Sequence, residues 1–273
     1  MLENRVQFMK IISWNINSLR LRLPLLRELI KQSNADVICL QETKVQDSDF
    51  PALEIKSMGY EFLSFSGEKS YNGVAIISRF PIKSSESIDI LNYGHKRHIK
   101  ATFETKIGEV DLHNFYVPAG GDIPDVDLND KFDHKLKFID WMTDYFATQK
   151  SRKIIIVGDI NIAPLEHDVW SHKQLIKIVS HTPIEVQKLN NLQKQLNFID
   201  THRHFIDPSQ KLYTWWSYRA KDPLGADKGR RLDHIWATPN LEKQIQDMKI
   251  YKDFRAAVQT SDHVPIQTNF NLL

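Results

Sequence analysis

The chain has 273 residues and a formal net charge of +2, with 41% hydrophobic and 26% charged residues. This composition is ordinary for a globular protein, and the nearly balanced charge gives no evidence by itself of a polyanionic partner. The single cysteine, Cys39, excludes a disulfide framework, and no apolar stretch reaches the roughly 20 residues that a membrane span needs. We therefore expect a cytoplasmic protein without a signal peptide or a membrane anchor.

Apolar runs typical of buried strands alternate with amphipathic segments along the chain. Helices are predicted after Pro24, from Phe132 to Phe146, and from Thr182, where Pro183 and Glu185 complete a capping-box pattern. Many strands with interspersed helices predict a sandwich of two sheets with helices outside. The strand-like runs cover 10–16, 36–42, 73–78, 86–91, 98–105, 109–116, 153–160, 232–238 and 264–270.

Polar residues stand at the ends of several of these runs. Because residues i and i+2 of a strand point to the same face, paired polar residues there share one side of the strand. If the strands are neighbours, carboxylates, amides and one imidazole meet on one rim, where a hard cation would offset the repulsion between carboxylates. One such residue alone is usually a turn residue or a helix N-cap, whereas the coincidence at five places favours a functional site. The residues are Asn15, Asn17, Glu42, Asp159, Asn161, Asp233, Asp262 and His263.

This set of residues suits metal-assisted phosphodiester hydrolysis, which needs a cation, a positioned water and donors for the developing charge. Glu42 is the first candidate for a metal ligand, because it is anionic and follows a buried strand. Asn17 and Asp262 could complete the shell together with waters, since Mg²⁺ keeps several. Tyr116 could offer its hydroxyl to the phosphate or to the leaving group, although a single tyrosine is more often packing.

The remaining polar residues fit proton handling. Asp159 could orient or deprotonate the attacking water, and Asn161 and Asn15 could hold Asp159 and the phosphate by hydrogen bonds. His263 could donate to a phosphoryl oxygen. We expect Asp233 to be the carboxylate that raises the pKa of His263, although Asp233 by itself could pair with a surface arginine.

A basic stretch near the C-terminus also contains aromatic residues. Cations and stacking rings in one segment are typical of nucleic-acid binding, and the alternative is a solvated loop with two core tryptophans. The stretch 211–231 contains Lys211, Trp215, Trp216, Tyr218, Arg219, Lys221, Lys228, Arg230 and Arg231, against only Asp222 and Asp227.

Seven motifs stand in the order of a known family. The chain resembles the exonuclease III family of apurinic/apyrimidinic endonucleases, which belongs to the endonuclease/exonuclease/phosphatase superfamily. The resemblance runs from Met9 to the end. It implies that residues 9–273 form one domain after a short extension at 1–8, which agrees with candidate site residues from both ends of the chain. The motifs lie at 13–20, 40–44, 73–75, 158–164, 215–219, 231–233 and 261–263.

The resemblance implies a four-layered α/β sandwich, deoxyribonuclease-like, of two packed and mainly antiparallel sheets flanked by helices. It implies cleavage of the DNA backbone 5′ to abasic sites with Mg²⁺, for which Mn²⁺ could substitute, together with 3′→5′ exonuclease and 3′-end-cleaning activity on duplex DNA. The expected partner is duplex DNA, and we expect a monomer without an obligate protein partner.

By motif position, the resemblance gives the residues named above the same roles and adds DNA contacts. Two positions depart from relatives: some carry Asp where this chain has Asn17, which affects the metal ligands, and some eukaryotic relatives carry Trp near Arg230, which affects the pocket. The DNA contacts implied are Asn72, Arg97, Trp215, Arg219 and Leu232.

Two other functions stay open at this point. A phosphatase or phosphodiesterase of the same fold, acting on inositol phosphates or lipids, would share the catalytic rim, and the 211–231 stretch argues against it. A catalytically dead DNA-binding module is the second, and intact Glu42, Asp159 and His263 argue against that. A serine triad, a zinc site and a P-loop each lack their motif.

Overall fold

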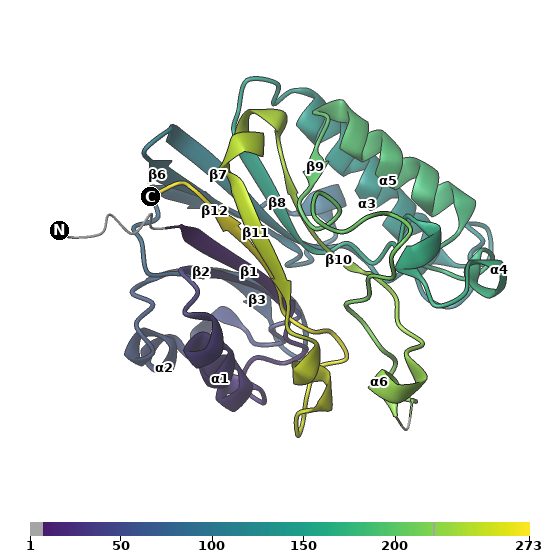
Figure 1. Cartoon of the computed structure of the whole chain (residues 1–273), viewed down its shortest axis with the longest axis horizontal. Coiled ribbons are helices and arrows are strands. Elements are labelled where there is room, and N and C mark those ends of the chain that lie inside the picture. The colour runs from purple at the N-terminus through teal and green to yellow at the C-terminus, as the bar shows by residue number, and fades with distance from the viewer. Residues whose placement is uncertain (1–7, 221) are drawn as a thin grey trace.

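A computed structural model describes residues 8–220 and 222–273, so most of the predicted extension at 1–8 lies outside the described residues. Two six-stranded sheets pack face to face (Figure 1). The first sheet has the order β11-β12-β1-β2-β4-β3, and the second β5-β6-β7-β8-β10-β9. The strands are β1 (Met9–Asn15), β2 (Val37–Gln41), β3 (Phe62–Glu68), β4 (Tyr71–Ser78), β5 (Ser84–Glu86), β6 (His98–Thr105), β7 (Gly108–Tyr116), β8 (Ile154–Asp159), β9 (Ile199–Asp200), β10 (Asp233–Ala237), β11 (Ile245–Ile250) and β12 (Ile266–Phe270).

Helices cover the outer faces of both sheets (Figure 1). Helices α1 and α2 pack on the first sheet through a cluster that includes Leu26, Leu29 and Ile55. Helices α3 and α5 pack on the second through a cluster that includes Phe138 and Leu192. The predicted four-layered α/β sandwich is confirmed, while a single domain over 9–273 stays a prediction. The helices are α1 (Leu23–Ser33), α2 (Ala52–Ser57), α3 (Asp130–Ala147), α4 (His172–Leu175), α5 (Pro183–Gln195) and α6 (Pro223–Ala226), with 3₁₀ turns at Asp47–Asp49, Ile90–Asn92, Glu166–Asp168, Pro239–Gln244 and Lys252–Ala256.

The inner faces of the two sheets form a shared apolar core, to which strands of both sheets contribute fully buried aliphatic side chains. One polar contact also crosses this interface. Gln41 Nε2 donates to Asn114 Oδ1 at 2.7 Å, and Asn114 Nδ2 donates back to the carbonyl oxygen of Leu40 at 3.0 Å. Both side chains are fully buried, so any hydrogen-bond partner must come from inside the protein, and Gln41 Oε1 is left without one. These bonds fix the register of one sheet on the other close to the end of β2.

Two parallel strand pairs decide where the polar residues lie. Most neighbours are antiparallel, but β1 runs parallel to β2 and β7 parallel to β8. Asn15 is in register with Gln41, and Tyr116 is in register with Asp159. Parallel strands end at the same edge of a sheet. The last residues of all four strands, and Asp233 opposite Asp159 on β10, therefore lie along one rim of the sandwich.

At the margins of the sheets, the prediction from the sequence is wrong or incomplete. The predicted strand at 86–91 is wrong: β5 ends at Glu86, and Leu91 (φ 64°) and Asn92 (φ 56°) turn the chain. Strands β3 and β11 were not predicted, because both are edge strands with exposed residues that break the apolar pattern. The helix from Pro183 does begin with the predicted capping box. Within the described residues, no helix is long and apolar enough to cross a membrane.

Candidate active site

The rim where the parallel strands end contains a cleft of about 700 Å³. Its floor and walls come from both sheets and from loops that follow them. Every catalytic or metal-ligating residue predicted from the sequence either lines this cleft or bonds directly to a residue that does. The residues that line it include Glu42, Tyr116, Asp159, Asn161, Trp170, Trp215, Arg219, Lys228, Arg230, Leu232, Asp262 and His263.

Asn15 links the two sheets at the floor of the cleft. This last residue of β1 is fully buried, and its Nδ2 lies 2.9 Å from Glu42 Oε1 and 2.9 Å from Asp159 Oδ2. The same nitrogen lies 3.4 Å from His263 Nε2. One amide group therefore contacts the carboxylate of one sheet, the carboxylate of the other and the imidazole.

Asp159 is held by the turn that follows β8. Its Oδ1 accepts from the backbone N–H of Asn161 at 3.0 Å, and its Oδ2 accepts from Asn161 Nδ2 at 3.1 Å. Asn161 has φ 56°, a left-handed conformation that asparagine tolerates. Gly158 has φ 147°, and a Cβ there would lie 2.0 Å from the carbonyl oxygen of Phe115, so only glycine fits. Asp159 is thus both a turn residue and a group facing the cleft.

The turn after β1 repeats this arrangement. Asn15 Oδ1 accepts from the backbone N–H of Asn17 at 3.1 Å, and Asn17 has φ 47°. The expectation that residues i and i+2 share a face therefore applies only in part, because Asn17 and Asn161 already lie beyond the extended strand. The two side chains of each pair nevertheless lie at the same rim.

His263 lies between two carboxylates. Its Nδ1 is 2.8 Å from Asp233 Oδ2, and its Nε2 is 3.6 Å from Asp159 Oδ2. Burial alone would lower the pKa of His263, but the negative charges of Asp233 and Asp159 outweigh it and raise the pKa to about 10. Burial raises the pKa of Asp159 to about 7, with the charge on His263 opposing that rise. The imidazole is therefore positively charged at neutral pH, while Asp159 is close to its own titration point.

Lys44 belongs to a second polar cluster, next to Glu42. Its Nζ lies 2.9 Å from Glu42 Oε2 and 2.6 Å from Asn17 Oδ1. Asn17 Nδ2 donates to Asp262 Oδ1 at 3.2 Å, and Trp215 Nε1 donates to Asp262 Oδ2 at 2.9 Å. Burial opposes ionisation of Glu42, but the Asn15 amide and the Lys44 ammonium together hold the pKa of Glu42 below its usual range.

These oxygens are suited to a hard divalent cation. The Lys44 ammonium is a positive charge held by one carboxylate and one amide oxygen, and these oxygen ligands are the kind that Mg²⁺ and Mn²⁺ prefer. A different group, Asp159, Asp233 and His263, also brings three possible ligand atoms within 4.8 Å of one another. It fits a hard cation less well, because one of its three ligand atoms is an imidazole nitrogen and not an oxygen. The donors around Glu42 therefore fit a divalent metal ion best.

Tyr116, the last residue of β7, lies next to Glu42. Burial and the neighbouring Glu42 carboxylate raise the pKa of Tyr116 well above its ordinary value, so the phenol stays protonated. Arg97 stacks on its ring, with the guanidinium carbon 4.6 Å from the ring centre. Arg97 and Asn72, both predicted DNA contacts, are only 5% and 1% exposed. Asn72 Nδ2 donates to Glu68 Oε1 at 2.7 Å. In this structure Arg97 packs behind Tyr116 and neither residue lines the cleft, so DNA contact by either stays a prediction.

One wall of the cleft is apolar with a cationic border. Leu232 packs with Trp215 and Trp170 in one cluster. Arg230 lies over the Trp215 ring at 5.4 Å, and Lys228 lies over the Trp170 ring at 4.9 Å. Four aromatic or basic residues of the predicted DNA-binding stretch therefore line the cleft that holds the carboxylates: Trp215, Arg219, Lys228 and Arg230. Trp216 and Arg231 are instead buried in the protein, and Lys221 lies outside the described residues.

Two lysines at the site were not identified as site residues from the sequence. Lys44 could have been found, because it stands two positions after Glu42 in the same strand-end motif. Lys135, on α3, is fully buried and donates to the backbone carbonyl of Asn161 at 2.7 Å and to the carboxylate of Glu185. Burial lowers the pKa of Lys135 even though Glu185 opposes this. Its spacing is a signal that could have found it, because Lys135 stands three residues after Phe132 and four before Ile139, on the apolar face of the helix.

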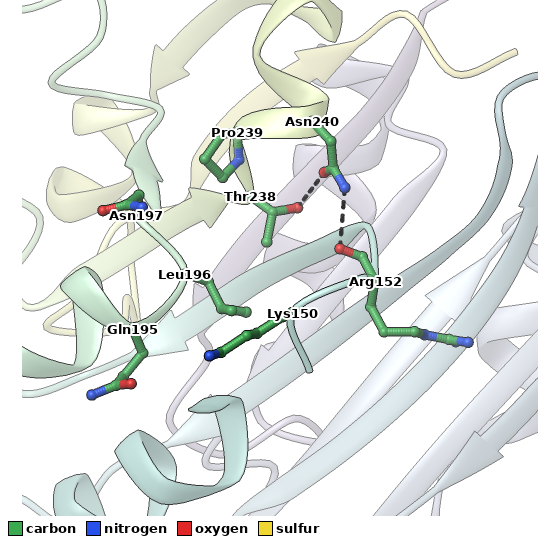
Figure 2. A pocket seen from close by; sticks show the side chains of 8 residues that line it. All are labelled: Lys150, Arg152, Gln195, Leu196, Asn197, Thr238, Pro239 and Asn240. Carbon is green, nitrogen blue, oxygen red and sulfur yellow. Dashed lines mark hydrogen bonds between the residues drawn. The ribbon is translucent and has the colours of Figure 1, made fainter. Parts of the chain in front are cut away.

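A separate cleft of about 370 Å³ lies at the other edge of the second sheet (Figure 2). It contains Arg152, which precedes β8, and Thr238, which follows β10, whereas Asp159 and Asp233 stand at the far ends of these strands. Asn240 bridges its walls by bonds to Thr238 Oγ1 (2.7 Å) and to the carbonyl of Arg152 (3.2 Å) (Figure 2). Among the described residues, its lining contains no carboxylate.

Comparisons with known proteins agree with this geometry. Exodeoxyribonuclease III of Haemophilus influenzae is 30% identical over 96% of this chain and 100% of its own, and the exodeoxyribonuclease of Bacillus subtilis is 27% identical over 97% and 100%. Among solved structures, an AP endonuclease from Archaeoglobus fulgidus superposes with a TM-score of 0.88 at 30% identity, covering 97% of this chain and 100% of that one. The 3′ phosphatase NExo from Neisseria, bound to product DNA hairpin, gives 0.88 at 30% identity, covering 96% and 99%.

A family model covers nearly the whole chain as well, including every predicted catalytic and metal-ligating residue. It matches residues 12–263. The family predicted from the motifs is thereby confirmed: the chain belongs to the Endonuclease/Exonuclease/phosphatase family.

Proposed function

We propose that this protein is a metal-dependent DNA repair nuclease that hydrolyses the phosphodiester 5′ to abasic sites and removes nucleotides or blocking groups from 3′ ends of duplex DNA. The observation that carries the proposal is the position of Asn15, whose amide contacts Glu42, Asp159 and His263 in one cleft. The names of the relatives, which include exodeoxyribonucleases and AP endonucleases, support the choice of DNA as substrate.

The proposed reaction begins with the scissile phosphate next to His263. The positively charged His263 imidazole donates from Nε2 to a phosphoryl oxygen, while Asp233 holds Nδ1 and keeps the ring charged. Asn15 Nδ2 donates to Glu42 Oε1 and to Asp159 Oδ2, so both of its hydrogens are used to orient the two carboxylates beside the phosphate. The His263 donor stabilises the charge that grows on the phosphate as the water attacks.

Asp159 takes the proton from the attacking water. Its two oxygens are aimed by Asn161 and Asn15, so the carboxylate need not reorganise during the step. A pKa of about 7 suits a general base at neutral pH. The Tyr116 hydroxyl, which stays protonated, faces the phosphate from the other wall and can donate to it or to the leaving oxygen.

Glu42, Asn17 and Asp262 would hold the metal, and Mg²⁺ is the proposed ion, with Mn²⁺ as a substitute. A divalent cation there would neutralise phosphate charge and assist departure of the 3′ oxygen. The chain's own part is to fix these ligands: Asn15 and Lys44 hold Glu42, and Trp215 holds Asp262. Because Asn17 is neutral, its amide can donate to Asp262, which an aspartate at that position could not do.

The aromatic and basic wall supplies the proposed DNA contact. Trp215 and Leu232 would receive a sugar turned out of the helix, and Arg219 would contact the backbone, as would Asn72 and Arg97 if DNA binding exposes them. Such contacts release counterions, so affinity for duplex DNA should fall steeply with salt. We further propose that the protein acts as a monomer in the cytoplasm without an obligate protein partner.

The deciding experiment is a cleavage assay on an end-labelled duplex with one tetrahydrofuran abasic analogue. We expect a single Mg²⁺-dependent cut immediately 5′ to the analogue, leaving a 3′-hydroxyl, and no turnover of a soluble inositol phosphate. Asp159→Asn should lose at least about a hundredfold in kcat while binding the duplex almost normally, because its role is proton transfer. Asp140→Asn, on the outer face of α3, is the matched control and should keep full activity. Turnover of the inositol phosphate without DNA cleavage, or tight DNA binding with no cleavage at any pH, would refute the proposal.

The metal assignment has its own test. Glu42→Gln keeps the side-chain shape but removes the charge, so half-maximal activity should need at least about tenfold more Mg²⁺. Binding of Mn²⁺ to the free protein, followed by electron paramagnetic resonance, should weaken in parallel and does not depend on turnover. Unchanged Mn²⁺ affinity in this variant would exclude Glu42 as a ligand.

A further inference from the structure

Arg230 places a cation at the apolar wall of the cleft that Trp215 and Leu232 form. Its backbone pairs with Trp215 through two hydrogen bonds of 2.9 Å, and both side chains line the cleft together with Leu232. The guanidinium carbon lies 5.4 Å from the Trp215 ring centre. The wall that would receive an extrahelical sugar is therefore not purely hydrophobic.

Only part of this guanidinium is used inside the protein. Nη1 donates to the carbonyl oxygen of Val179 at 2.9 Å and to Ser180 Oγ at 2.8 Å, which fixes the plane of the group. Nε is buried without a partner. Among the described residues Nη2 has no hydrogen-bond partner, and unlike Nε it is not buried. Nη2 is therefore a charged donor that is open to the cleft, held in place by the Nη1 bonds and free to bond to an acceptor on a ligand.

The substrate of the proposed function offers such an acceptor at one place. A natural abasic sugar carries an oxygen on C1′, as hemiacetal or aldehyde, where the base has been lost. The tetrahydrofuran analogue has only hydrogen there and is otherwise nearly the same size. Trp215 bonds to Asp262 through Nε1 and has Arg230 over its ring, so it lies between a carboxylate and the guanidinium. With the sugar between Trp215 and Leu232 and its phosphates at the carboxylates, the C1′ edge, which faces away from the phosphates, would point toward Arg230.

We propose, on the basis of the proposed function, that Arg230 is a specificity-determining residue whose Nη2 donates a hydrogen bond to the C1′ oxygen of a natural abasic residue. The pocket thereby selects the natural lesion over an analogue without that oxygen. A charged donor in a water-poor pocket contributes more than a neutral one, and the analogue would leave the donor unpaired. We expect the preference in kcat/KM to be on the order of tenfold to a hundredfold.

The test compares two duplexes that differ only at C1′: one with a natural abasic site, freshly made by removing uracil, and one with tetrahydrofuran. Enzymatic incision leaves a 3′-hydroxyl, which a gel separates from the product of spontaneous elimination. Wild-type protein should favour the natural site, and Arg230→Met should bring the ratio of kcat/KM values close to one. Arg230→Gln, which keeps a neutral N–H donor, should keep part of the preference.

Lys228→Met is the matched control, because it removes a cation from the same cleft where it lies over Trp170. This variant should slow both substrates alike and leave the ratio unchanged. Loosening of the 179–180 segment in Arg230→Met would likewise slow both substrates equally, so only the ratio reports the proposed contact. Equilibrium binding of both duplexes in EDTA should show the same ratio without turnover.

Each outcome decides between the two proposals. If both duplexes are cut but wild type shows no preference, or Arg230→Met and Arg230→Gln keep it in full, the Arg230 contact is wrong and the nuclease function stands. If neither duplex is cut under any metal condition, the nuclease function fails and the sugar pocket fails with it.

Discussion

The buried ion pair behind the site gives a prediction about stability. Lys135 and Glu185 both have fully buried side chains. Lys135→Met keeps most of the side-chain volume but removes the ammonium that donates to Glu185, to Asn161 O at 2.7 Å and to Ala119 O at 3.2 Å. Glu185 keeps neutral donors from Ser180 and Thr182, yet its negative charge loses its partner.

Breaking such a pair costs about 3–5 kcal/mol, because one charge stays buried without compensation. The loss is a large part of the 5–15 kcal/mol that is typical of a folded protein. We expect Lys135→Met to lower the free energy of unfolding by this amount in urea titrations followed by tryptophan fluorescence. The double variant Lys135→Met/Glu185→Gln should recover part of the loss, because it removes the second charge as well.

Lys137→Met on the same helix is the control. Its ammonium also contacts a carboxylate, Asp133, at 2.6 Å, but the side chain is 58% exposed. Water and salt screen such a pair, so we expect no measurable change in the free energy of unfolding. If Lys135→Met and Lys137→Met changed stability equally, or the Lys135 variant lost less than about 1 kcal/mol, the ion pair would not have the structural importance assigned to it.

Three further predictions concern the reaction. Asp159 must lose its proton to act as a base and His263 must keep its proton to act as a donor, so kcat/KM should rise through pH 7 and fall near pH 10; a flat profile from pH 5 to 8 would contradict the role of Asp159. Asp233→Asn removes the charge beside Nδ1, so NMR titration should show a lower pKa for His263, and kcat at pH 8 should fall at least about tenfold; an unchanged titration would exclude this pairing. Arg219→Gln should weaken duplex binding and make its salt dependence shallower by about one counterion, whereas an unchanged slope would place Arg219 outside the DNA contact.

How far the sequence predicts the fold depends on burial. The central strands and the helices α1, α3 and α5 follow from apolar periodicity, because their residues face the cores. Strands β3 and β11 lie at the edges of the first sheet, where one side meets solvent and the pattern fades. The segment at 86–91 is apolar enough for a strand, but Leu91 takes a left-handed conformation that no local pattern announces.

The site residues can be predicted for a related reason, but this prediction fails at a different place. Strand-end polar residues identify Asn15, Glu42 and Asp159, because parallel strands bring their ends together. The position of Lys44 depends on four positive-φ residues in the connections after β1 and β2, with φ 47° at Asn17, 87° at Ser18, 50° at Glu42 and 52° at Lys44. The alternation of side chains along a strand does not hold through such a backbone. The direction of the Lys44 side chain is therefore seen only in the structure.

The contact of Asn15 with both Glu42 and Asp159 means that neither sheet contains a working centre alone. Hydrolysis requires the two sheets to be docked to within a fraction of an ångström. Turnover should therefore respond to any change that shifts one sheet on the other, even far from the cleft and well before the protein unfolds. The hydrogen bond between the Gln41 and Asn114 amides joins the two sheets, so a shift of one sheet on the other would strain it.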